Sequence, residues 1–269
     1  RGDRLGPLAG VPFAVKNLFD IAGRPTRAGA KINRDRAPAE RDGALVRRLE
    51  AAGAILVGGL NMGEYAYDFT GENVHDGPTR NPHDLGHMSG GSSGGSGAAI
   101  AAGLVPLALA SDTNGSIRVP AAFCGCFGLK PTYGRLSRAG SFPFVGSLDH
   151  LGPMARSIRD LALAFSQLAG PDGLDAFASS TVPFDAGVTS DRKLRVGWMV
   201  GPGFGPIDTQ VAATVKAAAE ALKGEGHHVE EVRIPALERD FALDVFNKLH
   251  VMEMKPAFRE ATAGHEDQM

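Results

Sequence analysis

Two stretches rich in small residues dominate the sequence: GGSSGGS at residues 90–96 and SDTNGSIRVP at residues 111–120. The chain has 36 glycines among its 269 residues, and they concentrate between residues 86 and 146. Glycine is used where the backbone must turn tightly or come close to a ligand. We therefore expect the chemistry of the protein to lie in this region.

The first stretch, taken alone, has several interpretations. A run of glycine and serine is typical of a flexible connector. A helix that starts after a glycine-rich turn would instead present free N–H groups to an anion. A P-loop is excluded, because no Lys-Ser or Lys-Thr pair closes the pattern.

Residues 90–94 also fit the pattern G-x-S-x-G, which would make Ser92 the nucleophile of an α/β-hydrolase with a histidine base. That elbow needs a strand directly before it. Residues 81–88 (NPHDLGHM) are a poor strand, so the sequence disfavours this interpretation.

The second stretch joins the end of an expected strand to the start of a helix. Its consecutive N–H groups could form a nest that binds developing negative charge, as an oxyanion hole does. A helix cap rich in Ser and Thr is the simpler alternative. Lys16 lies in the apolar segment VPFAVKN (11–17). Lysine is rarely buried without a purpose, although a strand-end lysine can extend its amine to water.

The rest of the chain shows an α/β alternation with no internal repeat. Hydrophobic periodicity predicts a buried, mixed or parallel sheet. The segment 170–191 is the most linker-like. We expect strands over 10–20, 54–60, 105–110, 194–200 and 228–234, helices over 42–52, 96–102, 157–168, 209–222 and 241–261, another helix opening near Pro120, and a polar loop over 71–88.

Composition excludes some classes of protein. The net charge of −2 gives no reason to expect direct contact with nucleic acid or an anionic membrane. The apolar stretch 98–109 is interrupted by Gly103 and Pro106 and is too short to cross a bilayer. Cys124 and Cys126 lack a second pair at zinc spacing. No metal is therefore expected, and a reducing, cytoplasmic setting fits the free thiols.

Taken together, these segments resemble the amidase-signature family. The two stretches match its signature in order and spacing, with Ser92 and Ser116 24 residues apart. Further matches are AVKN (14–17), NMGEY (61–65), AFCGCFGLKPT (122–132) and SLDHLGP (147–153). The resemblance implies an amidase-signature fold, a mixed β-sheet core covered by α-helices on both faces. We expect a single domain over 1–269 with its catalytic core at 10–168. Because the sequence begins at Arg1 and stops after a helical pattern, we expect this domain to be truncated at both ends.

The resemblance also implies a Ser–cis-Ser–Lys triad without metal or organic cofactor. Ser116 matches the nucleophile, Ser92 the serine after a cis peptide bond, and Lys16 the base. A buried lysine can lose its proton near neutral pH, and a serine hydroxyl can relay a proton. The expected oxyanion donors are the N–H groups of Thr113, Asn114, Gly115 and Ser116, and the expected substrate contacts are Met62, Tyr65, Ser93 and Arg118.

Asn114 departs from the Gly-Gly that commonly precedes the nucleophile. Asparagine tolerates a left-handed backbone, so we expect the turn to persist and the Asn114 side chain to narrow the pocket or to add a polar contact. No histidine is required, and His150, His227 and His228 are expected to be structural or solvated. A non-catalytic scaffold is disfavoured, because Lys16, Ser92 and Ser116 are all present.

The implied activity is hydrolysis of a small amide or ureido C–N bond through a Ser116 acyl-enzyme, with release of ammonia or amine. Residues 27–36 (RAGAKINRDR) and 65–67 (YAY), with Asn114, resemble the carboxybiuret-hydrolase branch most closely. The alternatives are the A-type subunit of a tRNA-dependent amidotransferase or a general aryl or aliphatic amidase. We expect a small-molecule amide substrate, a homo-oligomer and a small accessory subunit, with no membrane and no direct nucleic acid contact.

Overall fold

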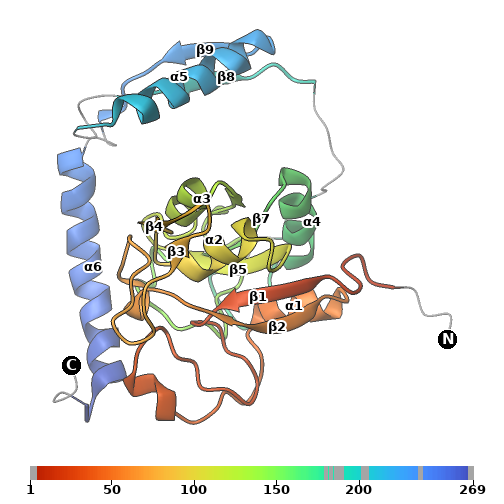
Figure 1. Ribbon diagram of the computed structural model, residues 1–269, viewed down its shortest axis with the longest axis vertical. Coiled ribbons are helices and arrows are strands. Elements are labelled where there is room, and N and C mark those ends of the chain that lie inside the picture. Colours follow the sequence, from red (N-terminus) through yellow and green to blue (C-terminus); the bar gives the residue numbers. More distant parts are fainter. Residues whose placement is uncertain are drawn as a thin grey trace. The chain divides into compact units, whose positions relative to one another are not determined.

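The computed structural model describes residues 5–178, 181, 184, 191–200, 206–235 and 239–265, and the side chains of all of these except 239–242. The chain divides into two compact units (Figure 1). The first unit is Arg1–Ala186 with Pro256–Met269, and the second is Gly187–Lys255. Each unit is considered by itself.

A five-stranded mixed sheet forms the centre of the first unit, in the order β2-β1-β5-β7-β6. The strands β2, β1 and β5 run parallel, whereas β7 is antiparallel to β5 and to β6. The mixed sheet is therefore confirmed. The bounds are β1 (Pro12–Lys16), β2 (Ile55–Leu60), β5 (Leu107–Asp112), β6 (Phe127–Gly128) and β7 (His150–Ala155).

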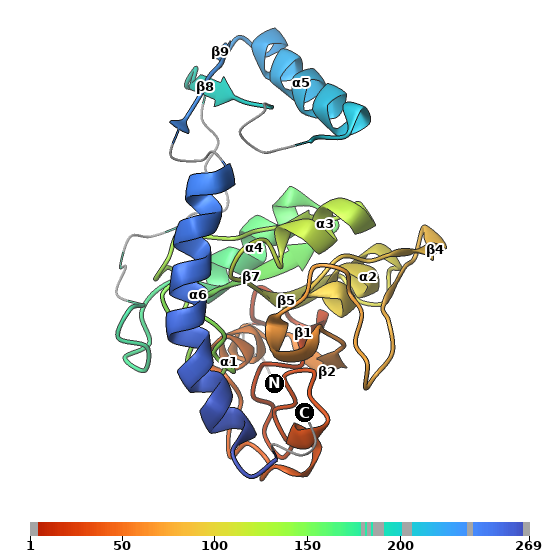
Figure 2. The ribbon, with the colours of Figure 1, turned by 90° about the vertical axis from the view of Figure 1, so that its left-hand side faces the viewer.

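Helices cover both faces of this sheet. Side chains of β5 are buried at every position, and those of β1 and β7 at all but the first. Because successive strand residues point to opposite faces, both faces must be covered. Helix α2 packs on α3, and α1 packs on α4. Figure 2 shows β1 between α1 and α2. The bounds are α1 (Ala44–Ala51), α2 (Gly94–Ala101), α3 (Arg118–Cys124) and α4 (Ile158–Leu168).

Helix α4 shows why the periodic segments fold as expected. Its buried residues Leu161, Ala164, Phe165 and Leu168 recur at the spacing of one helical face. The hydroxyl of Ser157 accepts a hydrogen bond from the N–H of Asp160 at 3.0 Å and so caps the first turn. The predicted helix over 157–168 is confirmed.

An antiparallel hairpin lies where a polar loop was expected. It consists of β3 (Arg80–Asn81) and β4 (Asp84–Met88), so the expectation that no strand precedes GGSSGGS was wrong. All five residues of β4 are exposed. Backbone pairing and the Asn81 side chain hold the hairpin in place. Because no face of β4 is buried, its sequence has no alternation of apolar and polar residues that could predict a strand. Asn81 accepts the His83 N–H through Oδ1 and donates from Nδ2 to the Phe123 carbonyl.

The second unit has the expected strand, helix, strand order. Strand β8 (Arg195–Trp198) pairs in parallel with β9 (His228–Glu231). Helix α5 (Thr209–Gly224) is capped by the carboxylate of Asp208. Much of the linker-like segment 170–191 lies outside the described residues. The remaining elements are the helix α6 (Arg239–Thr262) and the 3-10 turns η1 (Ile32–Asp35) and η2 (Glu64–Ala66). Within the described ranges, no helix has the length and apolar character needed to cross a bilayer.

Candidate active site

Lys16 ends β1 and lies fully buried beneath the two glycine-rich stretches. Its Nζ is 2.7 Å from Ser92 Oγ and 2.8 Å from Ser111 Oγ. The structure therefore brings together two of the three predicted triad residues, and it adds a second serine that the sequence interpretation did not single out.

The environment of Lys16 makes its amine a base at neutral pH. Burial lowers the pKa of Lys16 to about 7, against the opposing charges of Asp112, Asp149 and Asp68. Desolvation penalises the charged form of a lysine, whereas nearby carboxylates favour it. At this pKa much of the amine is neutral at pH 7 and can accept a proton.

Ser92 lies in the connection between β4 and α2. The Gly91–Ser92 peptide bond is cis, as the resemblance implies. The neighbouring glycine has no room for a side chain, because a Cβ on Gly91 would lie 2.2 Å from Asp68 Oδ2. The Ser92 hydroxyl has Lys16, and not a histidine, as its hydrogen-bond partner among the described residues, which argues against the α/β-hydrolase elbow.

Ser116 lies in the short turn between β5 and α3. The left-handed conformation expected for Asn114 falls on Gly115, whose φ is +134°. The Ser116 carbonyl accepts the Ser93 N–H at 3.3 Å, which ties the two stretches together. Within the described residues no hydrogen bond joins the hydroxyls of Ser92 and Ser116, so the relay between them stays a prediction.

Asp112 organises this turn, and the sequence interpretation gave it no role. Its buried carboxylate accepts the Gly115 N–H at 2.7 Å and the Ile117 N–H at 3.1 Å. It also accepts Nε and Nη2 of Arg118 at 3.0 and 2.9 Å. Burial opposes its ionisation, but the hydrogen bonds and charge of Arg118 outweigh burial and hold the pKa of Asp112 below its ordinary value. The turn that carries Ser116 is thus folded around a buried carboxylate.

This arrangement changes the predicted set of oxyanion donors. The Gly115 N–H is occupied by Asp112 and cannot also face a substrate oxygen. Thr113, Asn114 and Ser116 are the other predicted donors, and in the described part of the chain no hydrogen bond from their N–H groups is seen. Thr113, Asn114 and Ser116 therefore stay the predicted oxyanion donors.

A second buried carboxylate supports the same turn. Asp149 accepts the Thr113 hydroxyl at 2.6 Å and the N–H groups of Phe144 and Val145 at 2.7 and 3.0 Å. Burial outweighs these hydrogen bonds and raises the pKa of Asp149 above its ordinary value. Asp149 lies in the segment 147–153, which resembles the family but contained no predicted site residue.

A cavity of about 350 Å³ adjoins the site. Ser111 and Asp149 lie on its wall, so the cavity reaches the groups that contact Lys16 and Thr113. The lining is mostly apolar, with Arg138 and Asp175 as a paired polar group on the same wall. Its other lining residues include Leu18, Ala66, Phe142, Phe144, Leu151 and Phe177.

The family model described as Amidase matches residues 1–266 of the chain. The chain belongs to the amidase family.

Two curated relatives of the chain are similar to it over much of its length. The chain is 67% identical over 181 residues to the AtzE protein of 1-carboxybiuret hydrolase from Pseudomonas sp. (strain ADP), covering 67% of this chain and 40% of that protein. It is 46% identical over 243 residues to the A-type subunit of glutamyl-tRNA(Gln) amidotransferase from Anaeromyxobacter sp. (strain K), covering 87% of this chain and 48% of that protein. The chain thus spans 40–48% of the length of these two relatives.

One similar solved structure carries the description "An unexpected vestigial protein complex reveals the evolutionary origins of an s-triazine catabolic enzyme". It matches with a TM-score of 0.86 and 48% identity, covering 100% of this chain and 58% of that one. The match confirms the expected amidase fold.

The four predicted substrate contacts of this amidase-family chain do not line the cavity. Met62 and Tyr65 are buried, and Tyr65 packs against the rings of Phe142 and Phe258. The Ser93 hydroxyl donates to the Ser111 carbonyl at 3.1 Å. Arg118 is half-exposed and pairs with Asp112. The side chains of Ser93 and Arg118 thus have partners within the protein, and a substrate contact by any of the four residues stays a prediction.

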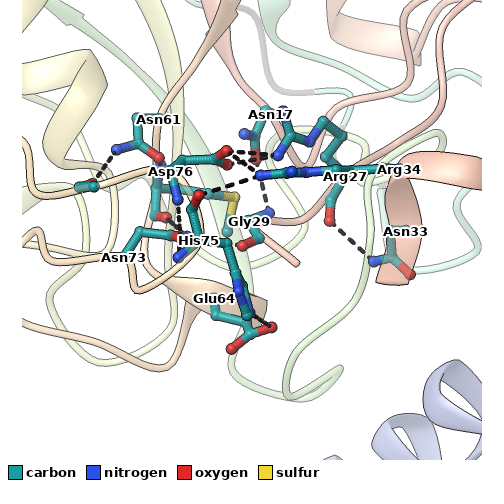
Figure 3. A network of polar contacts seen from close by, with 12 residues as sticks. Asn17, Arg27, Gly29, Asn33, Arg34, Asn61, Glu64, Asn73, His75 and Asp76 are labelled. Atoms are coloured by element: carbon teal, nitrogen blue, oxygen red, sulfur yellow. Dashed lines mark hydrogen bonds and ion pairs between the residues drawn. The ribbon is translucent and has the colours of Figure 1, made fainter. Parts of the chain in front are cut away.

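A polar network joins the end of β1 to two loops (Figure 3). Asp76 binds Nη2 of both Arg27 and Arg34, at 2.7 and 2.8 Å. Asn73 Nδ2 donates to the carbonyls of Gly29 and Met62, each at 2.8 Å. Asn17, directly after Lys16, accepts the Gly29 N–H at 3.0 Å. The network thus ties residues 27–34, singled out in the sequence, to the loop at 61–76 and to the end of β1.

Within the described ranges, no group of three or more His, Cys, Asp or Glu side chains is placed to hold a metal ion. Burial raises the pKa of both Cys124 and Cys126 to about 11. Their thiols are therefore protonated at neutral pH and are poor nucleophiles.

Proposed function

We propose that this protein hydrolyses the C–N bond of a small amide or ureido compound through an acyl-enzyme on Ser116. One observation carries the proposal: the buried amine of Lys16, with a pKa of about 7, contacts the Ser92 hydroxyl at 2.7 Å. A neutral amine placed against a serine hydroxyl is what activation of a nucleophile without histidine requires.

The proposed reaction starts with attack of the Ser116 oxygen on the substrate carbonyl. The Ser116 proton passes to Ser92, and the Ser92 proton passes to Lys16. Negative charge on the carbonyl oxygen is stabilised by the N–H groups of Thr113, Asn114 and Ser116. The C–N bond then breaks as the proton returns to the leaving nitrogen, which departs as ammonia or amine. Water, deprotonated by the same relay, then attacks the acyl carbon; the bond from that carbon to the Ser116 oxygen breaks, and the relay returns its proton to Ser116.

The substrate we propose is a carboxybiuret-like ureido compound. Two observations support it: the 67% identity to the carboxybiuret hydrolase protein and a cavity of about 350 Å³, at the small end of the range for ligand pockets. The tRNA-dependent amidotransferase is the second candidate, supported by 46% identity over a longer stretch. A general aryl or aliphatic amidase is the third.

Labelling with a fluorophosphonate tests the mechanism. The full-length protein is treated with the probe, and the modified residue is located by peptide mass spectrometry. We expect the label on Ser116, its loss in Ser116→Ala, and a labelling rate at least about a hundredfold lower in Lys16→Met. His150→Ala is the control and should still be labelled. A label on Ser92, or labelling of Lys16→Met at the wild-type rate, would contradict the proposal.

Ammonia release separates the candidate substrates. Carboxybiuret, biuret, glutamine and benzamide are compared at equal concentration, with Ser116→Ala as the blank. The highest kcat/KM for carboxybiuret would support the first candidate. The highest value for glutamine, stimulated by charged tRNA, would support the amidotransferase.

Assembly and location are proposed on the same basis. The relatives include one component of a hydrolase and a structure described as a protein complex. We infer that this protein forms a homo-oligomer, binds a small accessory subunit, and works in the cytoplasm, where its free thiols stay reduced. Light scattering of the purified full-length protein, by itself and with the candidate partner, tests the assembly.

A further inference from the structure

The loop at residues 67–71 carries an aromatic ring into the immediate surroundings of the nucleophile. Phe69 Cε1 lies 3.6 Å from the position that a Cβ on Gly115 would take. Gly115 directly precedes Ser116, so the edge of the Phe69 ring borders the turn on which the acyl group would form.

The backbone of Phe69 is fixed to the other half of the site. Its carbonyl accepts the Gly91 N–H at 2.9 Å, one residue before Ser92. The next turn is closed by Asp68, which accepts the Thr70 N–H, the Thr70 hydroxyl and the Gly71 N–H at 2.7, 2.6 and 2.7 Å. The backbone of Phe69 is therefore held at the first glycine-rich stretch, and its ring borders the second.

Core packing does not account for the ring. Phe69 is 47% exposed, although a side chain kept for the hydrophobic core would be buried. Because the ring beside Ser116 is half-exposed, a ligand can reach it, and aromatic rings line many small-molecule sites.

The same loop also reaches the cavity. The ring of Tyr67 lies 5.8 Å from that of Phe144, measured between centroids. Phe144 and Ala66 both lie on the cavity wall. The loop thus runs from the cavity, where a substrate would bind, to the turn, where it would be cleaved.

We infer that Phe69 is a specificity-determining residue that forms one wall of the acyl site and restricts Ser116 to small acyl groups. The inference rests on the proposed function. A rigid ring at a fixed backbone position excludes bulky groups sterically and leaves room for a flat, unbranched one such as a ureido carbonyl.

Two fluorophosphonates of different size test the inference. One carries methyl on phosphorus and the other phenyl, and the rate of Ser116 modification by each is followed by mass spectrometry of the intact protein. In Phe69→Ala we expect the phenyl-to-methyl rate ratio to rise by about tenfold or more, since the wall is removed. Phe69→Leu, which keeps an apolar side chain of intermediate size, should give an intermediate rise.

Phe127→Ala is the matched control. Phe127 is 44% exposed, close to the exposure of Phe69, and lies on β6. Its rate ratio should equal that of the wild type. A ratio in Phe69→Ala and Phe69→Leu equal to that of the control would overturn the inference and leave the proposed function intact. Failure of both probes to modify Ser116 in the wild-type protein would overturn the proposed function and the inference with it.

Discussion

In the proposed mechanism Lys16 sets the pH at which the site works, because only its neutral amine accepts the proton of a serine. Its pKa is lowered to about 7 by burial. The neutral fraction rises with pH, so the rate of Ser116 labelling should rise through about pH 7 and level off above it. Rates measured from about pH 5 to about pH 9 test this. A flat profile over that range would contradict Lys16 as the base.

Asp112 should affect the pH at which the labelling rate is half-maximal. Its negative charge favours the protonated lysine, and it is the first of the three carboxylates that raise the pKa of Lys16. In Asp112→Asn the amine should lose its proton more readily, so the rising limb should move to lower pH while the maximal rate falls through loss of the Arg118 pair. Asp84→Asn, an exposed carboxylate on β4, should leave the limb in place. A shift to higher pH in Asp112→Asn would contradict the assignment.

The turn between β5 and α3 depends on Gly115 for two reasons, its positive φ and its close approach to Val119. Comparison with Gly103 separates the two. Gly115 has a φ of +134°, and a Cβ there would lie 3.2 Å from Val119 Cγ2. Gly103 has a φ of +73° but open space around it. Gly103→Ala should cost about 1 kcal/mol of unfolding free energy and leave Ser116 labelling unchanged. Gly115→Ala should lower the labelling rate more than tenfold, about 1.4 kcal/mol in the barrier.

Urea unfolding and probe labelling of both variants provide the measurement. Equal labelling rates for Gly115→Ala and Gly103→Ala would show that the crowding by Val119 has no consequence for the nucleophile. A labelling defect in Gly103→Ala would show that global destabilisation, and not the local turn, controls the site.

The elements with clear periodicity could be predicted from the sequence, and those held by contacts with distant segments could not. Helix α4 repeats Leu161, Ala164, Phe165 and Leu168 on one face. Strand β7 has the sequence character of a loop, because Gly152 and Pro153 interrupt it. Gly152 is needed there, since a Cβ would lie 2.0 Å from the Leu129 carbonyl oxygen. That contact is tertiary and leaves no trace in the local sequence.

Some residues of the candidate site could also be predicted from the sequence, and others could not. The family resemblance implied a triad that includes Lys16 and Ser92, and the structure has the two side chains at hydrogen-bond distance. The buried carboxylates Asp112 and Asp149 were missed, although a charged residue at the end of an apolar strand could have drawn attention to Asp112. The occupation of the Gly115 N–H by Asp112 depends on how the turn folds back, which spacing alone does not fix.

On the scale of the first unit, segments distant in sequence close one apolar cluster. Ala28, Ala30 and Tyr65 pack with Phe142, Phe258 and Ala261. Arg36 Nη2 donates to the Ala261 carbonyl at 3.0 Å. The end of α6 therefore stabilises the segment that follows β1 and Lys16.

Phe258→Ala should lower the unfolding free energy by about 2 kcal/mol, less than for a fully buried ring, because Phe258 is only partly buried. Met252→Ala is the control on the same helix, since Met252 is 73% exposed. Urea unfolding of both variants tests this. An equal loss in the two would mean that the end of α6 contributes little to the stability of the unit.

Strand β2 lies at one margin of the five-stranded sheet, and in the described part of the chain no further strand pairs with it. Its outward positions include Ile55 and Val57, 55% and 58% exposed. Unpaired amides and carbonyls beside apolar side chains form a template for a strand from another molecule. In concentrated solution, two copies of the protein should therefore associate through their β2 edges. Val57→Lys should raise the concentration at which light scattering first detects aggregates, because a charge on this margin repels an incoming copy.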